Sequence, residues 1–313
     1  MKQITSTLLM VRPAAFRKNE QTAVNNYFQE DLALQNEEIN SRAQEEFDAF
    51  VNKLRAYNIE VLVLEDEKKY DTPDSVFPNN WISTHENGNI AIYPMYAVNR
   101  RKERREEFFQ LLEESGFRIN DIIDYTEAED EGVFLEGTGS IVLDRQNELA
   151  YCALSARADE ELFIEFCEDF EYFPVVFNAF QSVDGKRLPI YHTNVMMCVA
   201  EEFCVICLDS IDDKKERKVV IDQLKKSGKE IIAISEKQMH QFAGNMLQVE
   251  NVDGQKFLVM SASAYGVLNI RQIEQIEKYC AILSTDLYTI ETCGGGSARC
   301  MMAEIFLPRT KKQ

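Results

Sequence analysis

The sequence predicts an α/β protein, because short apolar strands alternate with amphipathic helices along its 313 residues. Hydrophobic residues make up 45% of the chain and charged residues 28%, a balance typical of a protein that buries a substantial core. Neither a Pro/Ser-rich linker nor a shift in composition marks a domain boundary. We therefore expect residues 1–313 to form a single domain.

The first half of the chain opens as a strand followed by a helix. In order, we expect a strand at 7–11, a helix at 38–57, strands at 59–64 and 90–95, and a helix at 99–115. Pro13 closes the first strand and Gly116 ends the last helix. That helix carries a run of mixed charges from Arg100 to Arg105, which we interpret as a solvent-exposed face rather than an anion site.

The second half continues the same alternation. We expect a hairpin of 140–143 with 149–154, a helix at 159–170, strands at 175–177, 195–200 and 204–208, a helix at 214–226, a strand at 230–234, paired strands at 246–249 and 257–261, and a helix at 271–279. Glycine-containing turns separate several of these segments. No fixed-period repeat is visible in the sequence, so periodicity alone predicts no repeat architecture.

Charge and cysteine usage exclude several classes of protein. The 53 acidic and 34 basic residues give a formal charge of −19, which disfavours nucleic acid and anionic membrane as partners. Eight cysteines in a chain of this length do not resemble a disulfide framework. The sequence starts without the pattern of a signal peptide, and no apolar run approaches the ~20 residues of a membrane span. We expect a cytoplasmic protein.

The last ordered segment places a cysteine directly after a glycine run. Gly294, Gly295 and Gly296 are costly to order, so they indicate a backbone shape or a close approach that no Cβ would permit. Cys300 follows at the start of an apolar strand. Such a cysteine is either an idle core thiol or a nucleophile, and only its partners distinguish the two.

The chain has three histidines, His85, His192 and His240. His85 lies in a polar turn and His240 in a helical stretch, and neither context suggests catalysis. His192 precedes an apolar strand, and alternation places it on the same side of the chain as Asn194. A histidine beside a strand is by default a hydrogen-bonded structural residue, so this pattern leaves its role open.

Two further segments carry polar groups among apolar ones. Glu136 stands between an apolar pair and the turn Gly137-Thr138-Gly139, where a partly buried carboxylate needs a partner or caps a strand end. The turn lacks the third glycine of a dinucleotide fingerprint. Residues 71–81 interleave prolines, asparagines and the single Trp81, which suits either a turn or a pocket wall.

Together these segments resemble the guanidino-group-modifying superfamily of deiminases, dihydrolases, dimethylarginine hydrolases and amidinotransferases. The motifs that carry the resemblance, in order, are 73–81 (PDSVFPNNW), 135–139 (LEGTG), 153–157 (ALSAR), 192–194 (HTN) and 295–300 (GGSARC). The form Asn79-Asn80-Trp81 is most similar to that of citrulline-utilisation hydrolases. The resemblance implies an α/β propeller of five ββαβ-type modules around a central site.

The resemblance also implies roles for individual residues. Cys300 would be the nucleophile, His192 the general acid and base, and Glu136 the carboxylate that holds the histidine or a substrate nitrogen. Arg157 would hold the α-carboxylate of the substrate, with an ion pair to Asp159 or Glu160 as the structural alternative. The residues expected to line the pocket around the reacting group are Asp74, Asn79, Asn80 and Asn194.

The asparagines depart from the pattern of the arginine-processing members. Carboxylates match a guanidinium, which is a cation with donors only, whereas an amide offers a donor and an acceptor without charge. Asn79, Asn80 and Asn194 therefore suit the neutral ureido group of citrulline, although Asp74 and Glu136 keep some negative field. The hypothesis is hydrolysis of citrulline to ornithine, ammonia and carbon dioxide through a covalent thiol adduct.

Other interpretations stay open. The chain could be an arginine deiminase, a dihydrolase or an amidinotransferase, or a binding module like the ribosome anti-association factor that shares the propeller. No cofactor and no metal are expected, because Cys204 and Cys207 lie in an apolar strand without a second pair at ligand spacing. The expected partner is a small amino-acid substrate, and a homo-oligomer is an open alternative.

Overall fold

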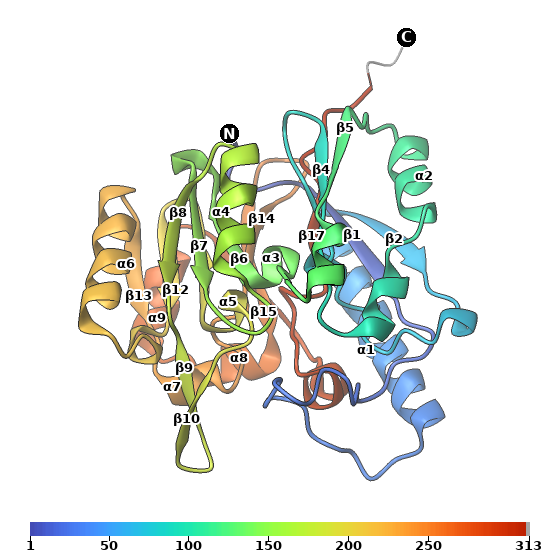
Figure 1. Ribbon diagram of the computed structural model, residues 1–313, viewed down its shortest axis with the longest axis horizontal. Helices are drawn as coiled ribbons and strands as arrows, with labels where there is room; N and C mark the ends of the chain where they lie inside the picture. Colours follow the sequence, from blue (N-terminus) through green and yellow to red (C-terminus); the bar gives the residue numbers. More distant parts are fainter. Residues whose placement is uncertain (311–313) are drawn as a thin grey trace.

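The computed structural model describes residues 1–310, and one pairing of three strands recurs five times in it (Figure 1). In each three-stranded sheet the central strand is antiparallel to one neighbour and parallel to the other. The sheets are β17-β1-β2 (Ala303–Glu304, Thr7–Arg12, Glu60–Glu65), β3-β4-β5 (Ile82–Thr84, Asn89–Ile92, Asp121–Asp124), β6-β7-β8 (Ile141–Asp144, Leu149–Ala153, Phe173–Phe177), β11-β12-β13 (Met197–Val199, Phe203–Ile206, Glu230–Ala233) and β14-β15-β16 (Leu247–Glu250, Lys256–Ser261, Ala281–Thr285).

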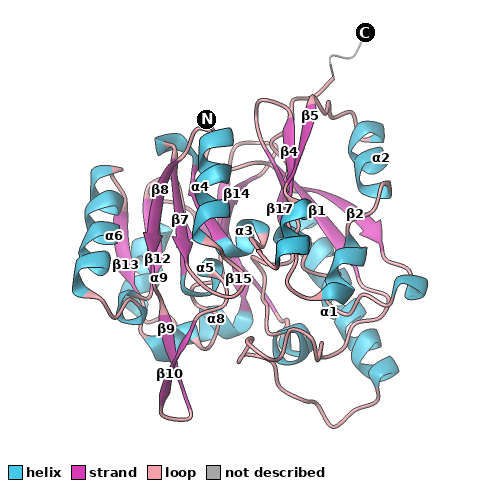
Figure 2. Cartoon of the chain, in the orientation of Figure 1, coloured by secondary structure: helices cyan, strands magenta, loops and turns pink. Residues whose placement is uncertain are grey.

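A helix connects the two parallel strands of every sheet, because parallel neighbours need a crossover. The connecting helices are α1 (Asn36–Ala56), α2 (Glu107–Glu114), α4 (Glu160–Asp169), α6 (Lys214–Lys226) and, after the short α8 (Ala262–Val267), α9 (Ile270–Glu277). Helices α2 and α6 lie at opposite edges of the molecule (Figure 2). The predicted α/β class is confirmed, and each unit has the order ββαβ, with β17 from the end of the chain completing the first.

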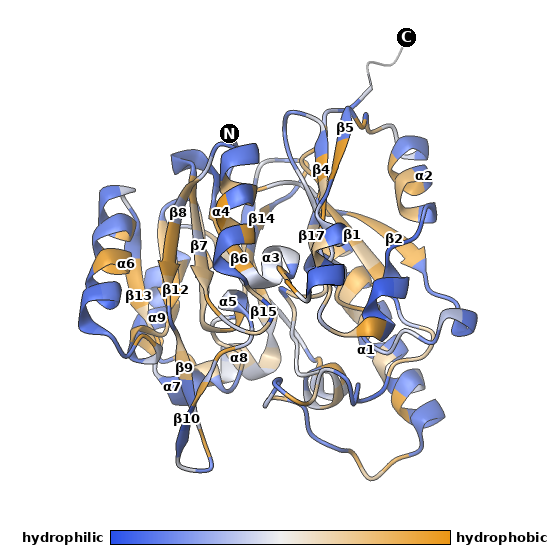
Figure 3. Cartoon of the chain, in the orientation of Figure 1, coloured by the Kyte–Doolittle hydropathy of each residue, from blue (hydrophilic) through white to orange (hydrophobic). Residues whose placement is uncertain are grey.

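Apolar side chains concentrate between the strands and the inner faces of these helices. Hydrophobic colouring follows β2, β7 and β8, whereas the outer face of α6 is hydrophilic (Figure 3). In α1 the buried positions recur at helical spacing and include Phe47, Phe50 and Leu54. One hairpin, β9 (Phe180–Val183) with β10 (Lys186–Pro189), stands apart from the five sheets and projects from the body (Figure 1).

Two predicted elements have a different secondary structure from the one expected. The helix expected at 99–115 is divided into a 3₁₀ helix, Val98–Glu103, and the shorter α2, because Arg100 and Glu103 turn inward rather than toward water. The strand expected at 195–200 begins as the short helix α5 (Thr193–Met196) and becomes β11 only at Met197. The hairpins of β6 with β7 and of β14 with β15 are confirmed.

Residues 13–35 form a connection without strand or regular helix between β1 and α1. A loop of this length inside a folded protein usually has a function of its own. Its position is set by polar contacts to the last glycine run and to residues of the cavity described below. Among residues 1–310, no helix is long and apolar enough to cross a membrane.

Candidate active site

Segments from several ββαβ units converge on one small cavity of about 10 Å³. Cys300 reaches it from the turn before β17, and His192 lies immediately before α5. Asp74 and Asn80 come from the segment between β2 and β3, and Arg157 comes from the turn before α4. Glu136, immediately before the short helix α3 (Gly137–Ser140), contacts two of these lining residues. Residues as far apart in sequence as Asp74 and Cys300 thus meet at one place.

A buried hydrogen bond links the histidine to the glutamate. His192 Nε2 lies 2.7 Å from Glu136 Oε2, and both side chains are at most 2% exposed. The other oxygen, Oε1, accepts the N–H of Tyr96 at 3.0 Å. Burial alone raises the pKa of Glu136, but the charge of Arg157 and the hydrogen bond to His192 outweigh it and lower the pKa to about 2. Glu136 is therefore ionised at neutral pH.

Burial shifts the pKa of the His192 imidazole in the direction opposite to its effect on the carboxyl group. It lowers the pKa of His192 to about 4, against the hydrogen bond and charge of Glu136, which raise it. His192 is therefore neutral in the unliganded protein at pH 7. A neutral imidazole beside an ionised carboxylate can accept a proton and then be stabilised as imidazolium, which is the behaviour of a general base.

Two glycines let α3 approach this pair. Gly137 has φ +44°, and a Cβ there would lie 2.5 Å from the carbonyl oxygen of Asn79. A Cβ on Gly139 would lie 2.5 Å from Asn80 Nδ2 and 2.8 Å from His192 Nδ1. The Gly-x-Gly turn is thus needed for close packing against the histidine, and no strand-end cap is required to explain it.

The glycine run before the cysteine likewise allows a close approach of the backbone to its neighbours. A Cβ on Gly294 or Gly296 would come within 2.9 Å of the ring of Phe77, and Gly295 has φ +62°. Cys300 follows in a turn in which its N–H donates to the carbonyl of Ser297 at 3.0 Å. The expectation of a close backbone approach at the glycine run is confirmed.

Two asparagine amides contact the thiol, and sequence analysis found only one of them. Asn194 Nδ2 lies 3.5 Å and Asn245 Nδ2 lies 3.2 Å from Cys300 Sγ. Asn245 Oδ1 accepts the N–H of Arg299 at 3.0 Å, which fixes the amide with its donor toward sulfur. The sequence signal was Gly244, since a Cβ there would lie 2.3 Å from the carbonyl oxygen of Val195.

Arg100 contradicts the interpretation of its charged run as solvent-exposed. Its side chain is 2% exposed and forms an ion pair with Glu103 at 2.9 Å. Its NH1 donates to Asn80 Oδ1 at 2.7 Å, and Asp74 Oδ2 lies 3.9 Å from its Nε. Burial raises the pKa of Glu103 to about 7, although Arg100 opposes the shift. A buried cation requires partners, and these are the polar groups of the cavity wall.

Asp74 has one oxygen without a partner. Its Oδ2 accepts from Asn19 at 2.8 Å and from Thr22 at 3.1 Å, whereas the buried Oδ1 has no hydrogen-bond partner among residues 1–310. Burial raises the pKa of Asp74, with Arg100 opposing. Since Asp74 lines the cavity, its free oxygen is an acceptor available to a ligand.

Arg157 is paired with the site and not with its sequence neighbours. Its NH1 lies 3.4 Å from Glu136 Oε2, and its Nε donates to Asn25 Oδ1 at 2.9 Å. The guanidinium carbon lies 4.9 Å from the ring centre of Tyr191. Asp159 instead caps α4 by accepting the N–H of Leu162 at 3.1 Å.

Asn79 lies behind the cavity wall. Its Oδ1 accepts from Asn80 Nδ2 at 3.0 Å and its Nδ2 donates to Thr138 at 3.3 Å, while the cavity itself is lined by Asn80. The other two histidines are remote from the cavity: His85 is stacked on Phe170 with ring centres 3.9 Å apart, and His240 packs against Phe28. In the described part of the chain no cluster of His, Cys, Asp or Glu side chains could hold a metal ion.

The segment 13–35 covers the cavity, and sequence reasoning missed it. Asn26 and Gln29 donate to the carbonyl of Gly294, and Thr22 O accepts from Arg157 at 2.9 Å. The segment has no helical or strand period, so periodicity gave no signal. The available signal was its density of amide side chains between Asn19 and Gln29.

Comparisons with known proteins agree with this geometry. The model of the family described as N,N dimethylarginine dimethylhydrolase, eukaryotic, matches residues 12–307. A search of curated proteins finds no match. Among solved structures, apo ArgZ, an arginine dihydrolase from the ornithine-ammonia cycle in cyanobacteria, superposes with a TM-score of 0.73 at 17% identity, over 97% of this chain and 41% of ArgZ.

Two further solved structures match this chain over nearly the whole length of both proteins. The substrate-bound N-terminal domain of ArgZ matches with a TM-score of 0.69 and 17% identity, over 95% of this chain and 97% of that domain. A dimethylarginine dimethylaminohydrolase variant, in an adduct with S-methyl-L-thiocitrulline, matches with a TM-score of 0.62 and 15% identity, over 96% and 100%. This chain thus spans less than half of full-length ArgZ but almost all of its N-terminal domain.

These matches define the protein as a guanidino-group-modifying enzyme, a hydrolase of C–N bonds other than peptide bonds. Within that class, the chain belongs to the N,N-dimethylarginine dimethylhydrolase family of eukaryotic type. The resemblance to the superfamily is confirmed. A special closeness to citrulline hydrolases is not supported by these matches.

The depressed pKa of His192 predicts a pH dependence of stability. Between pH 6.5 and about 4 the unfolded chain protonates this histidine and the folded protein does not, so stability falls as the pH falls. Replacing His192 with Asn should reduce the slope of unfolding free energy against pH between 6.5 and 5, by at most ~1.4 kcal/mol per pH unit. Urea unfolding across this range measures it, with His240→Asn as control. An unchanged slope in His192→Asn would contradict the assignment.

Gly139→Ala should disable the site without unfolding the protein. The added Cβ meets Asn80 and His192, and a displacement of about 1 Å at a catalytic group can cost ~10²-fold in rate. Gly266→Ala is the matched control, because Gly266 lies in α8 with no neighbouring atom within 4 Å of its Cβ position. Circular dichroism and turnover are measured for both. Full activity in Gly139→Ala would show that the close approach is not required.

Proposed function

We propose that this protein is a cysteine hydrolase that cleaves the ureido group of citrulline, giving ornithine, ammonia and carbon dioxide. The observation that carries the proposal is the convergence of Cys300 and His192 on one cavity, with Glu136 bound to His192 and amides against the sulfur. Membership in a family of C–N hydrolases supports the enzymatic interpretation over a non-catalytic binding module.

In the first half-reaction the thiolate of Cys300 attacks the ureido carbon. Neutral His192 takes the thiol proton, and Glu136 stabilises the imidazolium that forms. His192 then protonates the terminal nitrogen, the C–N bond to it breaks and ammonia leaves. An S-carbamoyl enzyme remains, in which the ornithine nitrogen is still bonded to the carbonyl carbon.

In the second half-reaction His192, neutral again, activates a water molecule. The water attacks the thioester-like carbonyl, the C–S bond breaks and the thiol regains its proton from His192. The released carbamate loses carbon dioxide without further help, which leaves ornithine. The amides of Asn194 and Asn245 stabilise the sulfur anion at the start and the end of this cycle.

The fixed orientation of Asn80 supports a ureido substrate. Arg100 has donors only, so the amide oxygen of Asn80 must face it, and one amide hydrogen points to Asn79 Oδ1. The uncommitted group of Asn80 is its second N–H. A ureido carbonyl can accept that N–H and a guanidinium cannot, while the free Oδ1 of Asp74 accepts an N–H of either substrate.

Arginine is the second candidate substrate. The orphan carboxylate oxygen of Asp74 and the ionised Glu136 favour a cation, and ArgZ is named an arginine dihydrolase. Hydrolysis of arginine, as deiminase or dihydrolase, would use the same thiol, histidine and carboxylate. Transfer of the amidino group to an amine instead of water is the third outcome that a product assay distinguishes.

Arg157 is proposed to bind the α-carboxylate of the amino acid. Its planar fork suits bidentate capture, and Asn25 and the carbonyl of Thr22 now occupy two of its donors. A substrate carboxylate would replace Asn25, so residues 13–35 would move on binding. We further propose that residues 1–313 are one catalytic domain in which the five sheets surround the site as a five-bladed propeller.

Cys300→Ser should abolish ammonia release from citrulline, because serine lacks an ionisable thiol for attack. Cys293→Ser is the matched control, since Cys293 is equally buried and outside the cavity, and it should keep its activity. Ammonia and ornithine are assayed with citrulline and with arginine. Turnover retained by Cys300→Ser would refute the mechanism, and turnover of arginine alone would replace the proposed substrate.

Asn245→Asp should lower kcat/KM by roughly 10–100-fold, the cost of losing a hydrogen bond to a charged group. The acid keeps the acceptor for the N–H of Arg299 and removes the donor to sulfur. Alkylation of Cys300 by iodoacetamide should also require higher pH. The control is Asn269→Asp, where the acceptor that caps α9 is preserved. An unshifted alkylation profile would assign Asn245 a structural role alone.

A further inference from the structure

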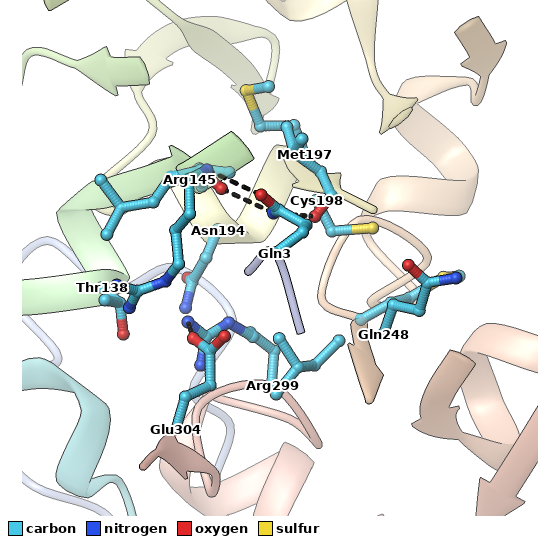
Figure 4. A pocket seen from close by; sticks show the side chains of 14 residues that line it. Gln3, Thr138, Arg145, Asn194, Met197, Cys198, Gln248, Arg299 and Glu304 are labelled. Carbon is cyan, nitrogen blue, oxygen red and sulfur yellow. Dashed lines mark hydrogen bonds and ion pairs between the residues drawn. The ribbon is translucent and has the colours of Figure 1, made fainter. Parts of the chain in front are cut away.

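A second cavity, of about 20 Å³, is lined in part by Asn194, whose amide contacts Cys300 Sγ. Its wall includes Arg145, Gln248, Arg299 and Glu304, together with Thr138 and Asn194 (Figure 4). None of the steps proposed above uses these charged groups. Their arrangement raises the question of what balances their charge.

Arg145 differs from the other buried arginines. Four arginines are less than 9% exposed, and three of them have a carboxylate partner: Arg100 with Glu103, Arg157 with Glu136, and Arg299 with Glu304. Arg145 is 3% exposed, yet it forms no ion pair with any residue from 1 to 310. Its guanidinium has two neighbours: the ring of Phe306, centred 4.0 Å from the guanidinium carbon, and the hydroxyl of Tyr172, whose pKa it lowers against the effect of burial. Tyr172 is uncharged, so it does not balance the charge of the arginine.

Nearby acceptors are committed elsewhere. Gln3 Oε1 accepts the backbone N–H of Arg145 at 2.7 Å, as Figure 4 shows, so it is not available to the side chain. Glu304 Oε2 pairs with Arg299 at 2.9 Å. Gln248 Nε2 is a second buried donor of the same cavity without a partner. The ionised side chains of the wall therefore carry one positive charge more than negative.

An arginine cannot relieve this imbalance by losing its proton, because its pKa is above 12. An unpaired charge in a buried place costs free energy unless a counter-charge or water compensates. Stacking on Phe306 covers one face of the guanidinium and leaves its N–H edge for an acceptor.

We propose that this cavity binds a small inorganic anion of the size of chloride, held by the guanidinium of Arg145. The anion comes from solvent and neutralises the excess charge of the wall. The proposal is independent of the citrulline reaction, because it concerns binding to the folded protein and no catalytic step. Water alone in the cavity is the competing occupant.

Thermal unfolding tests the proposal. Wild-type protein is titrated with sodium chloride, while sodium gluconate keeps the ionic strength constant, since gluconate is too large for the cavity. Tm should rise in a saturable manner, by roughly 2–4 °C once chloride exceeds its Kd tenfold. Arg145→Gln should not respond. Arg118→Gln, which removes an exposed arginine without side-chain partners, should respond as the wild type does.

Two results would overturn the proposal: an equal Tm of the wild type in chloride and gluconate, or an undiminished response of Arg145→Gln. Should Arg145→Gln fail to fold, crystals of the wild type soaked in sodium bromide replace it. An anomalous peak in contact with the guanidinium of Arg145 supports the site. Bromide found only on the surface, with water beside Arg145, rejects it.

Discussion

The site depends on the carboxylate of Glu136, which is completely buried and has a partner for each of its two oxygens. His192, Arg157 and the N–H of Tyr96 all bind its two oxygens, and they come from three different ββαβ units. A buried anion without these partners would be too costly to keep ionised. Its charge in turn holds the imidazole in place. Fold and chemistry are therefore coupled through one group, and the glycines of α3 are what let the units come close enough.

A second theme is the use of amides where charges would be expected. Asn80, Asn194 and Asn245 surround the reacting centre, and the orientations of Asn80 and Asn245 are each fixed by a neighbour that can only donate. An amide fixed in this way presents one defined hydrogen-bonding face, which makes it as selective as a charged group without the cost of burying one. Arg100 fixes Asn80, and the backbone N–H of Arg299 fixes Asn245. In the proposed reaction, the choice between a neutral and a cationic substrate would thus rest partly on the residues that orient these amides.

Sequence analysis identified the α/β class, several of the residues that meet at the cavity, among them Cys300 and His192, and the glycines that let them meet, because each has a local signature. The residues that sequence analysis missed have no such local signature. Arg100 and Glu103 look like a solvated face until Asp74 and Asn80, twenty or more positions earlier in sequence, bury them. Asn245 lies in a short turn whose importance arises only from contact with Val195 and Cys300. Residues 13–35 have no period at all. Long-range pairing decides these cases, and single-sequence periodicity does not contain it.

The pairing of β17 with β1 has a consequence for biosynthesis. Cys300 stands just before β17, and β17 completes a sheet whose other strands are made first. While the chain is being translated, the histidine and carboxylate can assemble well before any thiol faces them, and β1 presents an unpaired edge until β17 arrives. Closure of that edge and arrival of the cysteine are one event. With Cys300 as the proposed nucleophile, a nascent or truncated chain would be inert toward substrate and, at the same time, the form most exposed to aggregation.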